Sequence, residues 1–360
     1  MKNRHNWFNK GKGKREKGNV GRNCYPADNK KERDTMKTIL VAGGAGYIGS
    51  HTVKCLLNNN YNVVVVDNLV YGHKEAVLTT NFEQIDLADK PALEKVFKKY
   101  KIDAVIHFAA YTYVGESATK PQKYYWNNVV NTLNLLDIML ENNVKNIVFS
   151  STCATYGNPQ YTPIDEKHPQ SPINVYGRTK LMMEQIMADY DAAYGLKYAA
   201  LRYFNASGAD AESELGESHD PETHLIPLVL KAIKGEIPNI TVFGTDYDTS
   251  DGTCIRDYIH VEDLACAHML AVEKLFKDEK SLHINLGTGI GNSVKEIIKA
   301  SEEVTGKQVP VAYGERRIGD PAILYAANEK AKEVLNWNPK YTDIKEIIKT
   351  AWAWEQNKKF

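Results

Sequence analysis

A tyrosine and a lysine that could carry out proton transfer stand four residues apart in NVYGRTK, at residues 174–180. Side chains at this spacing share one face of a helix, so the Lys180 ammonium could stabilise a phenolate on Tyr176 and let it act as a base. A chain with 21 tyrosines contains about two such pairs by chance, so the spacing alone does not identify a catalytic pair. A second pair, Tyr341 and Lys345, has no cofactor-binding pattern around it and is interpreted as a surface match.

Hydroxyl side chains precede the first pair, at the end of the apolar run NIVFSS at residues 146–151. Ser150, Ser151 and Thr152 would lie at the carboxyl end of a buried parallel strand, where ligands bind in open α/β sheets. A helix that begins near Tyr176 could return to the same edge. The sequence therefore predicts a site that combines a phenol, an ammonium group and at least one hydroxyl group.

A glycine-rich turn follows the first apolar run of the chain. In GGAGYIGS, Gly43, Gly46 and Gly49 stand three residues apart between a predicted strand and a predicted helix. Glycines let the backbone approach a pyrophosphate, and the helix N-terminus directs free N–H groups at that anion. Asp67, at the end of the second predicted strand, would accept hydrogen bonds from the adenosine ribose and repel a 2′-phosphate. The order of these features predicts NAD rather than NADP.

Short β-branched runs alternate with longer helical patterns from Lys37 onward. Several runs are apolar without alternation, as expected for strands that are buried on both faces of a parallel sheet. The predicted strands are residues 38–43, 62–67, 82–87, 103–109, 146–151 and 197–203, and the predicted helices lie near residues 46–59, 90–100, 121–142 and 175–194. This alternation predicts an α/β fold with a doubly wound parallel sheet and right-handed crossovers.

Changes in local composition and hydrophobic pattern divide the chain into three parts. Residues 1–35 hold 11 Lys and Arg against four Asp and Glu and almost no aliphatic residues, which predicts a disordered basic extension. Residues 36–205 are predicted to form a Rossmann-type NAD-binding domain, to which later segments return near residues 240–270. Residues 206–360 are predicted to form mainly a smaller mixed α/β domain that binds the substrate.

The overall composition is typical of a soluble globular protein with no nucleic-acid or membrane partner. The formal net charge is zero, so no global field attracts nucleic acid or an anionic membrane, and no apolar run could span a bilayer. The five cysteines are odd in number and lack metal-ligand spacing, which favours a reduced, cytoplasmic location and no metal site. The polar, acidic segment 206–224 is interpreted as a loop or linker.

Residues 37–356 resemble the extended short-chain dehydrogenase/reductase family and, within it, the nucleotide-sugar 4-epimerases. The resemblance is carried by GGAGYIGSH, VVDNL, VIHFAA, VGES, YYWNNV, FSSTCATYG, VYGRTK, LRYFNASGA, DGTCIRDYIHVEDLA, NLGTGIGNSV and RRIGDPA. It implies interconversion of UDP-glucose and UDP-galactose by transient oxidation at C4 of the sugar, with NAD recycled in place. Tyr176 would take the proton of the 4-hydroxyl group, Lys180 would tune the Tyr176 pKa, and Thr152, or alternatively Ser151, would hold the oxygen.

The same resemblance implies which residues contact the two ligands. For NAD these are Gly43, Gly46, Tyr47, Ile48, Gly49, Asp67, Asn68, Asp86, Leu87, Phe108, Ala109, Asn128, Ser150, Tyr176, Lys180 and Phe204. For the UDP-sugar these are Thr152, Tyr176, Asn205, Leu225, Arg256, Arg317, Asp320 and Leu324. The two arginines suit a diphosphate, because a guanidinium group donates two hydrogen bonds in a fixed fork. A homodimer is implied as well, with the helices near 121–142 and 176–194 as its interface.

Two positions depart from the family pattern. Thr112 stands where several epimerases have a lysine near the cofactor and the substrate. Leu324 stands where members restricted to glucose have a bulky tyrosine. The smaller leucine leaves room at the 2′ substituent of the sugar, which predicts some activity on UDP-N-acetylglucosamine.

Three other functions compete with this interpretation. A 4-epimerase of UDP-xylose or of a UDP-uronate would differ in pocket size, which the sequence does not reveal. A 4,6-dehydratase needs an added acid and base, whereas here Cys153 and Ala154 follow Thr152. A non-enzymatic NAD-sensing protein would be marked by loss of the tyrosine or the lysine, and both are present.

Overall fold

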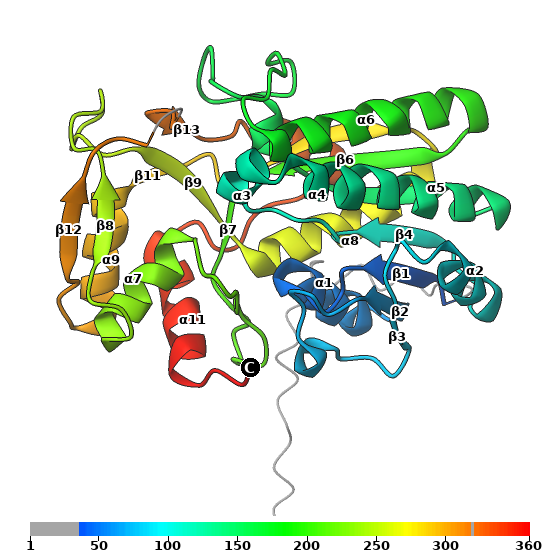
Figure 1. The fold of residues 1–360 in the computed structure, drawn as a ribbon, viewed down its shortest axis with the longest axis horizontal. Helices are drawn as coiled ribbons and strands as arrows, with labels where there is room; N and C mark the ends of the chain where they lie inside the picture. The colour runs from blue at the N-terminus through cyan, green and yellow to red at the C-terminus, as the bar shows by residue number, and fades with distance from the viewer. Residues whose placement is uncertain (1–35, 318–319) are drawn as a thin grey trace, which may run out of the picture. The chain divides into compact units, whose positions relative to one another are not determined.

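The protein is described by a computed structural model over residues 36–317 and 320–360, so the predicted basic extension at 1–35 lies outside the described residues. Its largest feature is a sheet of seven strands in the order β10-β6-β5-β4-β1-β2-β3, all paired in parallel (Figure 1). The strands are β1 Thr38–Ala42, β2 Asn62–Asp67, β3 Phe82–Gln84, β4 Ala104–His107, β5 Asn146–Thr152, β6 Lys197–Tyr203 and β10 Leu282–Leu286. The predicted doubly wound α/β fold is confirmed.

Helices cover both faces of this sheet, which explains why its strands are apolar on both sides. On one face α1 packs beside α8, and on the other α2 packs beside α5, with α6 next to β5 and β6. Their bounds are α1 Tyr47–Asn58, α2 Lys90–Lys99, α5 Asn131–Glu141, α6 Val175–Tyr194 and α8 Val261–Asp278. The core on the α2–α5–α6 face includes Leu40, Val64, Leu135, Phe149 and Met183, all of them buried.

The predicted helix at 121–142 is divided into three pieces. A short helix α4, Pro121–Tyr125, runs into a π-helical turn at Trp126–Val130 and then into α5. Such turns often occur at functional sites, because the extra residue per turn changes where side chains point. Short elements nearby are α3 Val114–Thr119 and the 3-10 turns Lys74–Ala76 and Cys153–Thr155.

A second, smaller region has mixed sheets. Strands β11, β9 and β13 form one sheet in which β7 also pairs with β9, and β12 pairs with β8 in another; the β11–β9 pairing is antiparallel. The strands are β7 Asn205–Ser207, β8 Ile240–Phe243, β9 Ile255–His260, β11 Gly291–Ser293, β12 Val311–Gly314 and β13 Ile323–Leu324. The helices are α7 Leu225–Lys234, α9 Val294–Thr305, α10 Glu329–Leu335 and α11 Ile344–Gln356.

The chain returns to the large sheet after it enters the second region. Helix α8 packs on α1, and β10 pairs with β6, with Leu282 opposite Ala199. The return therefore spans α8 and β10. It begins at Val261, inside the predicted range near 240–270, and extends beyond that range, whereas β8 and β9 belong to the smaller sheets. In residues 36–317 and 320–360, none of the helices combines the length and apolar character needed to cross a bilayer.

Candidate active site

The glycine turn after β1 is packed so closely that side chains could not replace two of its glycines. Gly43 has φ +83°, and a β-carbon there would lie 2.6 Å from the Ala109 nitrogen; a β-carbon on Gly49 would lie 2.1 Å from the Gly43 oxygen. The N–H groups of Phe108 and Ala109 both donate to the Ala42 carbonyl, at 2.8 and 3.0 Å. The turn, the end of β1 and the end of β4 thus form one rigid edge.

Helix α1 begins at this edge, and the N–H groups of its first turn have no partner within the helix. Gly46 is the N-cap residue, and within the described residues no side chain caps the helix. A β-carbon on Gly46 would meet only the Gly43 oxygen, at 3.5 Å. Tyr47 and Ile48 follow in the first turn, and the Tyr47 hydroxyl donates to the Gly208 carbonyl at 2.6 Å. This arrangement fits a pyrophosphate.

Two carboxylates lie at the ends of the next strands. Asp67 closes β2 and is 8% exposed; its carboxylate accepts hydrogen bonds from the N–H groups of Ala45 at 3.0 Å and Leu69 at 2.8 Å. Burial raises the pKa of Asp67, and these two hydrogen bonds counteract the rise. Asp86, after β3, accepts a hydrogen bond from Asn68 at 2.7 Å. The residues present at this edge fit the ribose and pyrophosphate of NAD.

Two further predicted cofactor residues are buried beside these carboxylates. Leu87 belongs to the apolar core beneath the edge. Asn128 lies in the π-helical turn, 3% exposed, and its amide group donates to the Tyr111 carbonyl at 2.9 Å and to Thr179 at 3.2 Å. Its oxygen accepts the Tyr111 N–H at 2.8 Å. Because its amide protons are used inside the protein, Asn128 positions the segment after β4, which contains the exposed Thr112.

Tyr176 is brought to the end of β5 by the way α6 begins. Asn174 caps the helix by accepting the Gly177 N–H at 2.7 Å. A β-carbon on Gly177 would lie 2.5 Å from the Ala154 oxygen, so the helix start touches the 3-10 turn that follows Thr152. The Thr152 side chain lies close to the Tyr176 hydroxyl and counteracts the rise in the Tyr176 pKa. The phenol and the hydroxyl group thus meet at the edge where β5 ends.

Lys180 lies one helical turn further along α6 and is 2% exposed. Its Nζ donates to the Ser150 carbonyl at 2.6 Å and lies 6.0 Å from the centroid of the Tyr176 ring. Burial lowers the pKa of Lys180 to about 7. Burial also raises the pKa of Tyr176, and the neighbouring Tyr203 raises it further. Lys180 was expected to lower the Tyr176 pKa, but without bound ligands the Tyr176 pKa is raised. The Lys180 ammonium is hydrogen-bonded to the Ser150 carbonyl, and burial disfavours the charge on both side chains.

The hydroxyl groups of the two serines already have partners. Ser151 is fully buried and donates to Glu184, which forms an ion pair with Arg202 at 2.5 Å. The Ser150 hydroxyl is 2.5 Å from that of Tyr203. Of the three hydroxyl groups at the end of β5, Thr152 is therefore the one that faces Tyr176.

A pocket of about 420 Å³ lies between β7, β8, β9 and α7. It brings together five of the predicted substrate residues, which are Asn205, Leu225, Arg256, Arg317 and Asp320. Arg256 forms an ion pair with Asp320 and also donates to the Ile255 carbonyl at 2.7 Å. The Arg317 guanidinium lies 4.1 Å from the centroid of the Phe243 ring. The pocket therefore offers two cationic groups next to aromatic and aliphatic walls.

The other predicted substrate residues lie outside the lining of this pocket. Leu324 is opposite Arg256 in the β13–β9 register and packs against the buried cluster that contains Phe204 and Tyr156. Phe243 and Tyr258 also line the pocket, and the sequence motifs did not indicate either residue. Tyr258 follows Arg256 by two residues, so the alternation of side chains along a strand could have indicated it.

The second tyrosine–lysine pair does not form a site. Tyr341 is buried, stacks on His260 with ring centroids 3.7 Å apart, and donates to Glu262 at 2.9 Å. Lys345 forms an ion pair with Glu303 at 2.6 Å. The interpretation of Tyr341 as a surface residue was wrong, because α11 packs it into the core of the second region.

A parallel doubly wound sheet with this glycine turn, a strand-end carboxylate and a Tyr–Lys helix defines an NAD-binding α/β enzyme. The family model described as "NAD dependent epimerase/dehydratase family" matches residues 39–287. The chain therefore belongs to this family.

The chain is also similar to individual UDP-glucose 4-epimerases. The curated UDP-glucose 4-epimerase of Halalkalibacterium halodurans is 52% identical over 318 residues, which are 88% of this chain and 95% of that protein. The crystal structure of UDP-glucose 4-epimerase from Brucella ovis in complex with NAD has a TM-score of 0.86 and 53% identity, covering 88% of this chain and 98% of that one. The Bifidobacterium longum enzyme in complex with NAD+ and UDP has a TM-score of 0.85 and 40% identity, covering 89% and 99%.

Proposed function

We propose that the protein interconverts UDP-glucose and UDP-galactose and keeps NAD bound throughout. The observation that carries this proposal is the placement of Tyr176 next to Thr152 at the end of β5, on the same sheet edge as the glycine turn. The high identity to curated UDP-glucose 4-epimerases over most of the chain supports the choice of substrate.

The residues that would hold NAD follow the edge of the sheet. The pyrophosphate would bind at the turn around Gly43 and Gly46 and at the start of α1. Asp67 would accept hydrogen bonds from the ribose hydroxyl groups. Asn68, Asp86 and the core beneath them would enclose the adenosine. NAD, when bound, supplies reversible oxidation at C4 of the sugar.

Three side chains of the protein would handle the proton at the sugar. The Tyr176 phenolic oxygen takes the proton of the 4-hydroxyl group and later returns it, and Thr152 holds that oxygen by a hydrogen bond. A buried phenol keeps its own proton at neutral pH, so positive charge close by is needed to favour the phenolate. Lys180 supplies one such charge from the same helix.

The pocket between β7, β8, β9 and α7 would hold the UDP part of the substrate. Arg256 and Arg317 would bind the diphosphate, with Arg256 exchanging its present partner Asp320 for a phosphate. The aromatic ring of Phe243 and the apolar side chain of Leu225 would enclose the uracil. The Bifidobacterium longum structure is in complex with NAD+ and UDP, which supports the binding of UDP by a chain of this fold.

A homodimer is also part of the proposal. Trp126, in the π-helical turn, is 58% exposed, and Met182 and Tyr194 of α6 are exposed as well. Large apolar side chains on neighbouring helices favour burial against a second copy. Sedimentation should therefore show a dimer, and a monomer at working concentration would contradict this part. The cytoplasmic location stays a prediction.

The direct test is to incubate purified protein with UDP-galactose and no added NAD. Formation of UDP-glucose is expected, because the cofactor is retained and regenerated. Tyr176→Phe should reduce the rate about 10²–10⁴-fold, since it removes the proton carrier. Tyr161→Phe, at an exposed tyrosine, is the control and should keep full activity. Unchanged turnover in Tyr176→Phe would reject the mechanism.

A further inference from the structure

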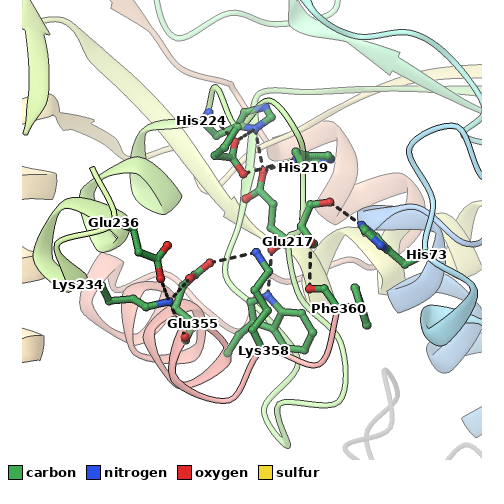
Figure 2. A network of polar contacts seen from close by, with 12 residues as sticks. His73, Glu217, His219, His224, Lys234, Glu236, Glu355, Lys358 and Phe360 are labelled. Atoms are coloured by element: carbon green, nitrogen blue, oxygen red, sulfur yellow. Dashed lines mark hydrogen bonds and ion pairs between the residues drawn. The ribbon is translucent and has the colours of Figure 1, made fainter. Parts of the chain in front are cut away.

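Four side chains converge on one point in the segment before α7, next to the pocket that α7 lines. Figure 2 shows His219 and His224 pointing toward Glu217, and Glu222 completes the cluster. In the sequence they form two copies of Glu-x-His, at 217–219 and 222–224. The sequence predicts a loop or linker here and no metal site, because that prediction considered the spacing of the cysteines and not these four side chains.

The distances between the four groups are those of ligands around one ion. His219 Nδ1 is 3.1 Å from a Glu217 oxygen and 3.8 Å from a Glu222 oxygen. His224 Nδ1 is 2.7 Å from Glu217 and 3.1 Å from Glu222. All four ligand atoms lie within 4.8 Å of one another. Ligands at about 2.0–2.1 Å from a tetrahedral zinc ion are about 3.3 Å apart, so small shifts would suffice.

The burial of the carboxylates calls for a cation. The side chains of Glu217 and Glu222 are 6% and 4% exposed. Within the described residues, neither carboxylate has a Lys or Arg partner within 4.0 Å, and the two histidines are the cationic side chains in that range. Glu222 also accepts the backbone N–H groups of Thr223 at 2.7 Å and His224 at 2.8 Å. Buried carboxylates are costly unless a counter-charge is present.

In a second acidic cluster of the same segment, a lysine supplies the counter-charge for the carboxylates. Asp210, Glu212 and Glu214 surround the Lys54 ammonium at 2.7, 2.8 and 2.9 Å. That cluster has a lysine at its centre and contains no imidazole group. The Glu217 cluster has the opposite composition, with two imidazole nitrogens where the lysine would be.

We propose that Glu217, His219, Glu222 and His224 bind one divalent transition-metal ion, with Zn²⁺ as the preferred ion. Two carboxylates carry the charge that a dication neutralises, and two imidazole ligands favour zinc over the oxygen-binding Mg²⁺ and Ca²⁺. Four protein ligands leave no open position for a reacting group, so the ion is structural.

The surroundings indicate what such an ion stabilises. His224 is the N-cap residue of α7 and lines the UDP pocket together with Leu225. The Glu217 carbonyl accepts a hydrogen bond from Trp354 of α11, and the Ser218 carbonyl is 2.9 Å from His73, near the large sheet (Figure 2). The ion therefore ties the start of α7 to a segment held between α11 and the NAD-binding region.

The test is the metal content of the full-length protein after removal of metals and reloading with Zn²⁺, followed by dialysis. The wild-type protein should retain about one equivalent more than either His219→Gln or His224→Gln. The comparison with variants subtracts zinc bound elsewhere on the chain. Reloading with Co²⁺ should produce the visible absorption of a tetrahedral site in the wild-type protein, and both variants should lose it.

Controls separate the site from an ion-pair cluster with protonated histidines. Glu214→Gln changes the second acidic cluster and should keep the full metal content. Zn²⁺, but not Mg²⁺, should raise the midpoint of thermal unfolding of the wild-type protein. Equal zinc retention in the wild-type protein and both histidine variants would overturn the proposal. If a variant does not fold, absence of the Co²⁺ absorption from the wild-type protein would still overturn it.

Discussion

At the scale of residues, Tyr176 and Lys180 lie where water is largely excluded, and burial disfavours the charged form of each. Burial raises the pKa of the phenol and lowers that of the ammonium to about 7. The closest partner of the Lys180 ammonium is a carbonyl group, which stabilises but does not neutralise it. The charge on this pair should therefore depend on what binds beside it.

The lowered pKa of Lys180 predicts a pH dependence of stability. Between pH 7 and the ordinary lysine value of 10.5, the unfolded chain keeps a proton on Lys180 that the folded protein has released. The free energy of unfolding should therefore rise with pH, by up to about 1.4 kcal/mol per pH unit relative to Lys180→Met, which has no titrating group. Denaturant unfolding at several pH values measures this difference.

A matched control for Lys180 is the lysine of the second pair. Lys345 is half-exposed and paired with Glu303. Lys345→Met should show the same pH slope as the wild-type protein in the range from 7 to 10.5, apart from a small loss of the surface ion pair. If the free energies of unfolding of the wild-type protein and of Lys180→Met change in parallel with pH, then Lys180 is charged in the folded state and the prediction is wrong.

Leu324 carries a prediction about specificity that rests on the proposed function. It is partly buried against the cluster of Phe204 and Tyr156, opposite Arg256. Replacing it with tyrosine adds bulk toward the sugar, so Leu324→Tyr should lower activity on UDP-N-acetylglucosamine by about tenfold or more. Activity on UDP-galactose should change little. Kinetics with both substrates measure this, and an equal loss on both would contradict a role in selecting the sugar.

At the scale of elements, the contact between the start of α6 and the turn after β5 fixes the distance from Tyr176 to Thr152. Gly177 allows this contact, because a β-carbon there would lie 2.5 Å from the Ala154 oxygen and 3.1 Å from Pro172. Gly177→Ala should push the helix away, lower the turnover rate by about 10²-fold, and cost about 1–3 kcal/mol of stability. NAD content should stay unchanged, since the glycine turn of α1 is not altered.

Gly115 offers the matched control for this substitution. It lies exposed in α3, and a β-carbon there would meet nothing within 4 Å. Gly115→Ala should be neutral or stabilise the protein by about 0.5–1 kcal/mol, because alanine favours helices. Turnover by Gly177→Ala at the wild-type rate would show that the close contact does not set the position of the phenol.

The elements that sequence patterns predicted well are those whose signals are local. Strands β2 and β6 match their predicted ranges, and β1 and β5 match to within one residue, because each is an apolar run buried on both faces. Asn128 could be named as a site residue, but its π-helical turn could not be foreseen. That turn depends on hydrogen bonds to Tyr111 and Thr179, which are distant in sequence.

Tertiary contacts also explain what the site prediction lacked. Ser151 and Thr152 are neighbours with similar side chains, and only the buried pair of Glu184 and Arg202 shows that Ser151 is already engaged. The Glu217 cluster was overlooked for a similar reason. Its two Glu-x-His copies form a cluster only when the segment folds back on itself.

At the scale of the whole molecule, the proposed site needs both halves of the chain. The predicted NAD-binding edge comes from residues before 205, whereas the UDP pocket comes from β7, β8, β9 and α7. The chain also crosses back, since α8 and β10 complete the large sheet. Patterns along the sequence predicted a return near 240–270, where α8 begins, but not the pairing of β10 with β6, because strand pairing between residues 80 or more apart leaves no local signal.

The last prediction concerns the basic residues 1–35. Every predicted site residue lies after Met36, and the 318 residues matched to the Halalkalibacterium halodurans enzyme already span 95% of that protein. The first strand is secured from within the rest of the chain, because the Thr38 N–H and the Lys37 ammonium both donate to Asp103, at 2.8 and 3.1 Å.

Deletion of residues 1–35 should therefore leave kcat, KM and the midpoint of thermal unfolding unchanged. Steady-state kinetics with UDP-galactose and thermal unfolding of both chains measure this. Because Asp103 joins the start of β1 to the segment before β4, Asp103→Ala in the shortened chain should lower the unfolding midpoint, which verifies that the assay detects loosening of this strand. A shortened chain that is folded but inactive would show that the basic segment takes part in the reaction.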